Sequence, residues 1–405
     1  MSSTKHAAPP QMLFLGNGGN VFSWTPHTKK KHQLTWSWEE DETRKDSEDN
    51  APARLIHMWP AWAPDGSRVA CFGMRGDIES KAVTSVYAVA ADGIESWELS
   101  SLSGGMPIYG NWSPRGDIFA ALVQREKDRL SLELIKLDQP GKPTSIISGA
   151  PLFWSWSPRG DQLAVHVGGS TNLTLGAQVV VIDADSGQIV EQITNRPGEF
   201  RVPAWNPQDN LIAYVEHDEQ RGETLFLYDT DNGDKGPVAA VNDGTAVLWS
   251  ADGNALAFGC ASRSSSSVFS QVKIVELARG RIETLLDEPI TGFFWSPCNK
   301  ALLYISVDQQ QSVFHWHRVE QASGTKTELA RFLPSREQMF ILSFFDQYTF
   351  SHPPIAPDGS ALAFAGYLLQ PSSSAPTTSQ VYLLSLESPA EPTSIAEGQF
   401  ACWNL

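Results

Sequence analysis

The chain has 405 residues and a formal net charge of −16, with 46 Asp and Glu residues against 30 Lys and Arg residues. This acidic balance argues against a nucleic-acid-binding protein, because such proteins need a basic face to neutralise phosphates. Hydrophobic residues make up 41% of the chain, which is enough for a large core.

No stretch of the sequence is apolar over the length that a membrane span requires, and the polar segment 1–11 lacks the apolar region of a secretory signal. We therefore expect a soluble, cytoplasmic protein with a flexible N-terminus, or a periplasmic one if a signal peptide has been removed. The four cysteines, Cys71, Cys260, Cys298 and Cys402, lie far apart, so we expect neither a disulfide framework nor a structural metal site.

The first elements are three short strands at residues 12–15, 21–24 and 32–36, separated by Gly-rich and Lys-rich turns. A charged run at residues 37–54 follows, which we interpret as a solvated loop, although an acidic docking segment is the alternative. From there one motif recurs: an aromatic anchor, then a Ser-Pro-Asp-Gly-like turn, then an apolar strand. Its anchors are Trp62, Trp112, Trp156, Trp205, Trp249, Trp295 and Ile355, separated by 44 to 60 residues.

The spacing of the repeat predicts a β-propeller, in which each repeat is one four-stranded antiparallel blade. Proline sets one backbone angle of each turn, and glycine permits the left-handed conformation that follows. The anchor Trp side chains are expected to be buried between adjacent blades. Residues 399–404 read as an eighth anchor stretch, which would complete the three N-terminal strands as a shared blade. We therefore predict a single domain over residues 1–405 with eight blades, closed between the two termini; the alternative is seven.

The turn, the apolar strand after it and the later Asp-Gly turns resemble the WD-like repeats of TolB-type β-propellers over almost the whole chain. That family includes protein-binding propellers and the propeller domains of prolyl oligopeptidase-like peptidases. The peptidase relatives carry their nucleophile in a separate hydrolase domain with a Gly-x-Ser-x-Gly motif, which this sequence lacks. We therefore predict that the protein is not an enzyme and acts as a platform for binding other proteins, with no cofactor. The alternative is an enzyme with an active site at the channel mouth, glycan-degrading or peptidase-related.

Two candidate metal motifs have simpler interpretations. His315 and His317 put two imidazoles on one face of a predicted strand, but no third ligand is identifiable by spacing, so an exposed strand face is the simpler interpretation. The run at residues 229–234 resembles a calcium loop without its closing glutamate, and we interpret it as a hairpin turn.

The binding surface is predicted in two places. The gap between Trp295 and Ile355 is longer than the others and contains an aromatic-rich insert at residues 331–352. Aromatic side chains supply much of the energy at interfaces; the alternative is that the insert packs over the rim and adds core. Polar residues shortly before the anchors are expected to ring the channel mouth. The predicted partner-binding residues are His57, Arg201, Ser351, His352, Gln399, Phe340, Phe344, Phe345 and Tyr348.

Overall fold

The computed structural model describes residues 9–37, 55–76, 83–102, 104–126, 129–169, 176–198, 201–242, 244–262, 265–308, 310–369, 376–388 and 391–404. Most of the charged run predicted as a loop, residues 38–54, lies outside this description, as do residues 1–8 of the predicted flexible N-terminus. Strands dominate the rest, and none of the described helices is long and apolar enough to cross a membrane.

Five sheets have four antiparallel strands each. In hydrogen-bonded order they are β3 (Lys30–Gln33), β2 (Val21–Thr25), β1 (Met12–Leu15) and β30 (Phe400–Trp403); β4 (Leu55–Trp62), β5 (Arg68–Arg75), β6 (Val83–Ala90) and β7 (Ser96–Ser101); β8 (Met106–Trp112), β9 (Ile118–Glu126), β10 (Arg129–Lys136) and β11 (Thr144–Gly149); β12 (Leu152–Trp156), β13 (Gln162–Val167), β14 (Gln178–Asp183) and β15 (Ile189–Thr194); β16 (Ala204–Trp205), β17 (Leu211–Asp218), β18 (Gly222–Asp229) and β19 (Lys235–Ala240).

A sixth sheet has ten strands, because two of its strands use their first and last parts to join successive groups of strands. The strand β23 pairs with β22 through its first part and with β24 through its last part, and β26 joins β25 to β27 in the same way. Its strands are β20 (Ala246–Trp249), β21 (Ala255–Ser262), β22 (Ser265–Glu276), β23 (Arg281–Trp295), β24 (Ala301–Asp308), β25 (Val313–Glu320), β26 (Lys326–Pro334), β27 (Ala361–Leu368), β28 (Gln380–Ser385) and β29 (Thr393–Glu397).

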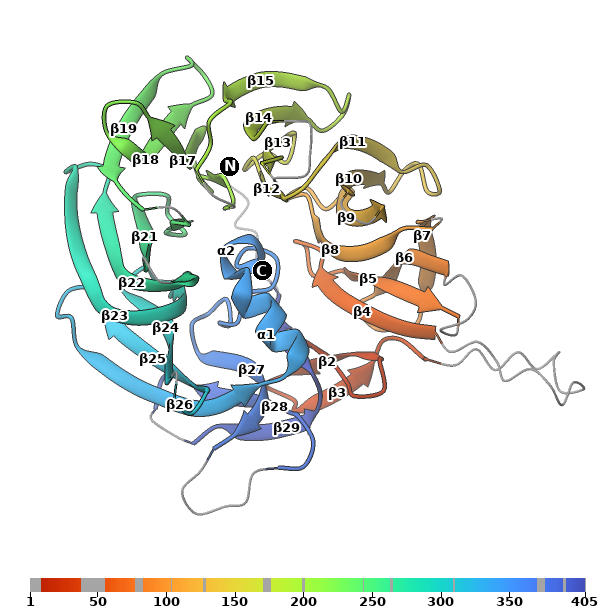
Figure 1. Cartoon of the computed structure of the whole chain (residues 1–405). Coiled ribbons are helices and arrows are strands. Elements are labelled where there is room, and N and C mark those ends of the chain that lie inside the picture. Colours follow the sequence, from red (N-terminus) through yellow and green to blue (C-terminus); the bar gives the residue numbers. More distant parts are fainter. Residues whose placement is uncertain are drawn as a thin grey trace, which may run out of the picture.

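The sheets are arranged around a central axis, as in a β-propeller, and the short first strands lie nearest the centre (Figure 1). The two ends of the described chain meet in one sheet, where β1 pairs with β30 and Phe14 lies opposite Ala401. The prediction of an all-β fold built from four-stranded antiparallel sheets is confirmed.

The recurring turn forms the bonds that its residues predict. In the turn after Trp156, the Ser157 hydroxyl donates to Asp161 Oδ1 at 2.7 Å, and its oxygen accepts the Gln162 N–H at 3.1 Å. Gly160 has a φ of 67°, the left-handed conformation that a residue with a Cβ adopts only with strain. The same residue types therefore fix a tight turn at the inner end of successive sheets.

Three of the anchor tryptophans, Trp112, Trp249 and Trp295, link their inner strand to the one before it by an indole hydrogen bond. The indole Nε1 of Trp112 donates to the Ala61 carbonyl at 3.2 Å, and that of Trp249 donates to the Ala204 carbonyl at 2.9 Å. Trp249 is 1% exposed, as the sequence predicts for an anchor between blades. Trp156 and Trp295 differ, because they are only partly buried and line cavities at the centre.

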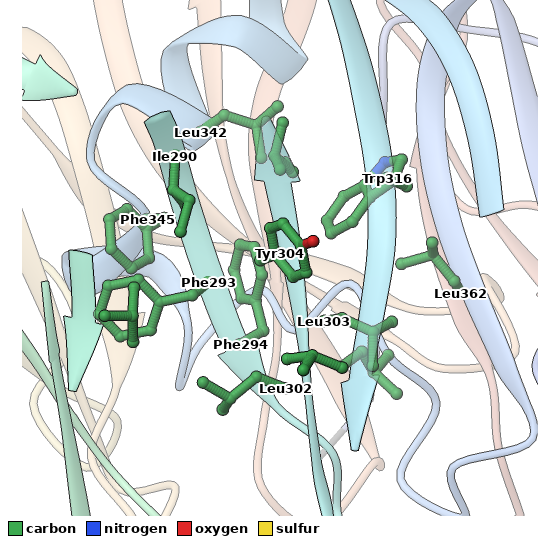
Figure 2. Packing of buried hydrophobic residues seen from close by; sticks show 14 of the residues in the cluster. Ile290, Phe293, Phe294, Leu302, Leu303, Tyr304, Trp316, Leu342, Phe345 and Leu362 are labelled. Atoms are coloured by element: carbon green, nitrogen blue, oxygen red, sulfur yellow. The ribbon is translucent and has the colours of Figure 1, made fainter. Parts of the chain in front are cut away.

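The insert contains two helices that the all-β prediction missed: α1 (Arg336–Ser343) and α2 (Phe345–Tyr348). Ser335 caps α1, since its hydroxyl oxygen accepts the Gln338 N–H at 3.0 Å. Both helices lie over the centre of the ring (Figure 1). Phe345 of α2 is 1% exposed and packs against Phe293 and Phe294 of β23 in the largest hydrophobic cluster (Figure 2).

Candidate functional site in the central channel

The insert is fixed to the inner strands by buried side-chain hydrogen bonds. The Trp154 N–H donates to Gln347 Oε1 at 3.0 Å, and Gln347 Nε2 donates to the Trp154 carbonyl at 2.9 Å. The Tyr109 hydroxyl of β8 donates to the Gln347 carbonyl at 3.2 Å and lies 2.7 Å from Ser351 Oγ. On the other side of the ring, the Ala365 N–H of β27 donates to Gln338 Oε1 at 3.1 Å. The insert is therefore held at the centre from several directions.

An ion pair joins the insert to the segment before β16. Arg201 Nη1 lies 3.6 Å from Asp346 Oδ1, and the two side chains are 14% and 3% exposed. The Arg201 Nε donates to the Gly244 carbonyl at 3.0 Å, and its guanidinium lies 5.2 Å from the centre of the Phe269 ring. These contacts fix the guanidinium beside the carboxylate.

A cavity of about 280 Å³ lies between α2 and the turns that end four of the inner strands. We call it the Asp346 cavity. Its walls are mainly aromatic and proline side chains, and its polar lining on the insert side comes from Asp346, Gln347 and Ser351. The aromatic and proline residues are Trp62, Trp112, Trp154, Trp156, Trp205, Phe350, Pro64, Pro114, Pro158 and Pro207.

Phe350 separates this cavity from a second one, also of about 280 Å³, which Phe350 lines as well. The second cavity is bounded by Trp295, Pro297 and Pro354 and is mostly apolar. The central channel is thus divided by the insert into two compartments, and only the Asp346 cavity has a carboxylate in its lining.

Asp346 has one paired and one buried, unpaired carboxylate oxygen, as Glu133 and Glu223 do, but among these three only Asp346 lines the cavity. Its Oδ1 faces Arg201, but its Oδ2 has no hydrogen-bond partner among the residues that the structure describes. Buried polar atoms in native proteins nearly always have a partner, so an exception calls for an explanation. A ligand in the Asp346 cavity that donates a hydrogen bond to Oδ2 would supply one.

Ser351 and His352 form a second polar pair at this site. Ser351 Oγ lies 2.8 Å from His352 Nδ1, and both residues are buried. Burial lowers the pKa of His352 to about 3. The imidazole is therefore neutral near pH 7 and is a weak base, although its distance to the serine fits a nucleophile and its base.

The residues that were predicted to ring the channel mouth lie in two separate parts of the structure. His57 and Gln399 line a separate cavity of about 250 Å³, together with Glu337 of α1. Burial lowers the pKa of His57 to about 4, and its Nδ1 has no hydrogen-bond partner in the described part of the chain. Arg201 lies instead beside Asp346 of the insert, and Ser351 and His352, which are themselves in the insert, lie beside Tyr109.

The predicted aromatic residues of the insert face different ways. Phe345 and Tyr348 are 1% and 2% exposed, whereas Phe344 is 37% exposed. Phe340 packs against Trp59, with ring centres 5.0 Å apart. The buried rings add core, and their role in binding a partner stays a prediction.

Sequence reasoning missed Asp346, Gln347, Tyr109 and Asn111. Asn111 Oδ1 accepts hydrogen bonds from the indoles of Trp154 and Trp156, each at 3.1 Å. One local signal was available: Ser335 followed three residues later by Gln338 is the pattern of a helix start, which would have predicted α1. No local sequence pattern identifies Asp346 as a site residue, because its partner Arg201 is distant in the sequence.

The run at residues 229–234 forms the hairpin turn that the sequence predicts. The Asp231 N–H donates to Asp229 Oδ1 at 2.9 Å, and Gly233 has a φ of 77°. The Asp231 carboxylate also accepts from Asn210 Nδ2 at 2.9 Å. The Asp229 and Asp231 carboxylates therefore accept hydrogen bonds from neighbouring protein groups.

Several solved structures match the chain at low sequence identity. They include the eukaryotic initiation factor (TM-score 0.54, 10% identity, 98% of this chain and 98% of that chain) and an oligogalacturonate lyase in complex with manganese (0.53, 12%, 94% and 97%). A structure from a study of two prolyl endopeptidases also matches (0.51, 10%, 90% and 50%). No family model and no curated protein matches the chain. At these identities the likeness establishes the β-propeller fold alone, and the assignment to the TolB-type family stays a prediction.

The comparisons overturn the prediction that the protein is not an enzyme. That prediction relied on the missing hydrolase domain. However, the structure aligns with 97% of an oligogalacturonate lyase, and therefore an enzyme with this fold needs no further domain. The alignment with prolyl endopeptidase covers only 50% of that chain.

Proposed function

We propose that the protein is a glycan-degrading enzyme, with the Asp346 cavity as its active site and Asp346 as its acid–base group. The observation that carries the proposal is Asp346, a residue that lines the cavity and whose buried Oδ2 has no hydrogen-bond partner among the described residues. A carboxylate oxygen in this position accepts a hydrogen bond or a proton from a bound ligand.

The walls of the cavity suit a sugar. A sugar ring has hydroxyl groups on its rim and apolar C–H groups on its faces, so it fits a site with flat apolar walls and a few polar groups. Trp156 and Trp205 provide such walls, and Asp346, Gln347 and Ser351 provide hydrogen-bonding groups. The volume of about 280 Å³ is close to the lower end of the usual range of ligand pockets and would hold one or two sugar units.

The charged groups favour elimination over hydrolysis. Glycoside hydrolysis usually needs two carboxyl groups, and Asp346 is the only one among the described residues that line the cavity. Elimination from an acidic sugar needs one base and a positive group beside the sugar carboxylate. Asp346 would take the proton beside the sugar carboxylate; a C=C bond then forms as the glycosidic C–O bond at the neighbouring carbon breaks, and water protonates the released oxygen. Arg201, which is not among the residues that line the cavity but lies 3.6 Å from Asp346, would offset the negative charge that develops. The substrate class is therefore an acidic oligosaccharide, as for the oligogalacturonate lyase that the chain resembles in fold.

A peptidase reaction is less well supported. Ser351 and His352 are within hydrogen-bonding distance, but a histidine whose pKa is lowered to about 3 takes a proton poorly at neutral pH. The Ser351 hydroxyl is also bonded to Tyr109. We therefore assign Ser351 to positioning the insert.

The proposal is tested by incubating the protein with acidic and neutral oligosaccharides and analysing the products by mass spectrometry. Elimination leaves an unsaturated fragment that lacks one water relative to a hydrolysis product. Asp346→Asn should lower turnover about 10²- to 10⁴-fold, the usual contribution of a general base. Trp156→Ala should weaken substrate binding instead.

The matched control is Asp358→Asn, which changes a carboxylate in an exposed turn, where Asp358 Oδ1 accepts hydrogen bonds from the N–H and the hydroxyl of Ser360. This variant should retain full activity. Cleavage that is unchanged in Asp346→Asn, or no cleavage of any oligosaccharide, would contradict the proposal. Peptide cleavage that is lost in Ser351→Ala would support the peptidase reaction in its place.

We further infer that the sheets form eight blades. The ten-stranded sheet contains three: β20 to β22 with the first part of β23; the rest of β23 with β24, β25 and β26; and β27 to β29 with the Ile355 stretch on their inner side. The five four-stranded sheets complete the count. The pairing of β1 with β30 supports closure of the ring in a blade made from both ends of the chain.

A partner-binding role for the insert is a second candidate. Phe344 and Met339 are 37% and 41% exposed, so the insert presents apolar side chains to solvent. Exposed aromatic side chains of this kind are enriched at protein interfaces. Such a partner would cover the insert side of the enzyme.

A further inference from the structure

A cluster of metal-ligand residues lies on β25 and β26, outside the Asp346 cavity. Side chains two residues apart in a strand point to the same face, so His315 and His317 of β25 share one face. Trp316 between them points to the opposite face, where it is fully buried in the hydrophobic cluster (Figure 2). The strand therefore has one side fixed in the core and two imidazoles on the other side.

The neighbouring strand supplies the third ligand that sequence spacing could not identify. Glu328 of β26 is the register partner of His317. The His315 Nδ1 lies 3.3 Å from Glu328 Oε2, and one ligand atom from each of the three residues lies within 4.8 Å of the others. In the described part of the chain, this is the group of histidine and acidic residues that comes close enough to hold a metal ion.

The separations are close to those that a metal ion requires. With bonds of about 2.0–2.2 Å to nitrogen and oxygen, two ligands of a tetrahedral ion lie roughly 3.3 Å apart. His315 and Glu328 already have this separation. The ligand atoms of the three residues all lie within 4.8 Å of one another, so a separation at that limit would have to shorten by roughly 1.5 Å when a metal ion binds.

Two of the ligands are oriented by outer contacts. His317 Nε2 is hydrogen-bonded to Ser306 Oγ at 2.9 Å, and the ring stacks on Tyr304 with centres 4.8 Å apart. Arg331 Nε donates to Glu328 Oε1 at 2.7 Å and Arg331 Nη2 donates to Oε2 at 3.4 Å, so Oε2 is shared between Arg331 and His315. Partners of this kind fix the orientation of metal ligands and raise metal affinity.

The local charges also permit a cation. The hydrogen bond from Arg331 lowers the pKa of Glu328, and burial lowers that of His317. At neutral pH the carboxylate is therefore charged and the His317 imidazole is neutral, which are the forms that bind a metal. Two cations lie nearby: Lys326 is paired with Glu288 at 2.7 Å, and Arg331 is paired with Glu328 itself at 2.7 Å, so that each has an acidic partner.

We propose that His315, His317 and Glu328 form a binding site for a divalent transition-metal ion, with Zn²⁺ as the ion that the ligands fit best. Two imidazoles and one carboxylate are a common ligand set for zinc, whereas calcium and magnesium prefer oxygen ligands alone. The bound ion would join β25 to β26. This site is independent of the glycan-degrading activity proposed for the Asp346 cavity.

The test is isothermal titration of ZnCl₂ into the full chain after treatment with a chelator. We expect one site per chain, and we expect His315→Ala and His317→Ala each to weaken binding at least about tenfold. Glu328→Gln should weaken binding in the same direction. Titration of CoCl₂ should give the visible absorption of a low-symmetry cobalt complex, and the two histidine variants should lose it.

The matched control is His217→Ala. His217 also lies 2.7 Å from a glutamate, Glu223, but has no second histidine beside it, so its removal should leave zinc binding unchanged. His317→Phe keeps an aromatic ring against Tyr304 and serves where His317→Ala is unstable. An absence of zinc binding, or equal affinity in the wild type and both histidine variants, would overturn the proposal. An equal loss of affinity in His217→Ala would overturn it as well.

Discussion

The side-chain amide of Gln347 pairs with the backbone of Trp154 as a neighbouring β-strand would. It accepts the Trp154 N–H at 3.0 Å and donates to the Trp154 carbonyl at 2.9 Å. The strand β12 is at the inner edge of its sheet, so these backbone groups would otherwise have no strand partner. One side chain of the insert therefore both completes the edge of a sheet and positions Asp346, the adjacent residue.

Replacing Gln347 with Leu should lower the free energy of unfolding by about 2–3 kcal/mol. The change removes two hydrogen bonds and leaves two buried backbone groups of Trp154 without a partner, each of which costs roughly 1–3 kcal/mol. Chemical denaturation measures the effect. Gln208→Leu is the control, because the Gln208 amide also bonds to a backbone carbonyl but does so at the exposed surface. Equal stability of the two variants would show that the insert is not held by this pairing.

Two anchor tryptophans should respond differently to truncation. Trp249→Ala should lower the free energy of unfolding by about 3–5 kcal/mol, because the ring is 1% exposed and its indole bonds to Ala204. Trp156→Ala should cost less, under about 2 kcal/mol, because Trp156 is partly exposed in the Asp346 cavity. Denaturant unfolding of both variants checks the order. A larger loss in Trp156→Ala would contradict the structural assignment of the two rings.

The buried His352 should make the protein less stable in acid. Its pKa is about 3 in the fold, against 6.5 for an ordinary histidine, so the unfolded chain takes up a proton at a higher pH than the folded chain does. The stability contributed by neutral His352 is therefore complete above pH 6.5 and is lost as the pH falls from 6.5 toward 3. Unfolding curves between pH 7 and about pH 4 should show this loss.

Other groups also titrate in this range, so a variant is needed to isolate His352. His352→Asn retains an acceptor near the position of Nδ1 but does not titrate. The wild type should be more stable than His352→Asn at pH 7, and the difference should shrink as the pH falls toward about 4. His32→Asn, at an exposed position of β3, is the control. A difference that stays constant with pH would show that His352 is not buried as a neutral imidazole.

Most of the fold could be predicted because its determinants are local. The turn after Trp156 depends on Ser157, Pro158 and Gly160, which are neighbours in the sequence, and the same local pattern recurs in successive sheets. The apolar strand after each turn is equally local, as with β13, which is buried on both faces. Repetition of a local pattern at a regular spacing was enough to predict a propeller.

The candidate site could be predicted only in part, because it is assembled from distant residues. Arg201 and Asp346 meet although neither has a distinctive sequence context, and Gln347 finds Trp154 across 193 residues. The prediction that His57, Arg201 and Gln399 share one mouth assumed an open channel. The insert instead fills the centre, so that Arg201 bonds with the insert while His57 and Gln399 line another cavity.

Phe344 and Phe345 are neighbours in the insert, but Phe345 packs in the core and Phe344 lies at the surface. Phe345→Ser should lower the melting temperature by about 4–6 °C, because the ring is buried against Phe269, Phe293 and Phe294 and its loss costs roughly 3–5 kcal/mol. Phe344→Ser should leave the melting temperature nearly unchanged, since Phe344 is 37% exposed. If a protein partner binds the insert, Phe344→Ser alone should weaken its capture. A large loss of stability in Phe344→Ser would contradict this division.

Removal of residues 398–405 should test how the two ends of the chain are joined. The strand β30 pairs with β1 over four residues, and it carries Trp403, which is fully buried. The truncation therefore exposes the inner edge of β1 and leaves a cavity where the indole lay, at a cost far above that of trimming a loose tail. We expect a markedly lower melting temperature and association of chains through the exposed edge, measured by calorimetry and size-exclusion chromatography.

Trp403→Ala separates the two effects, because it removes the indole but keeps the strand pairing, and it should destabilise the protein without causing association. A monomeric truncation with an unchanged melting temperature would show that β30 contributes nothing to the seam, and the proposal of an eighth, shared blade would fail.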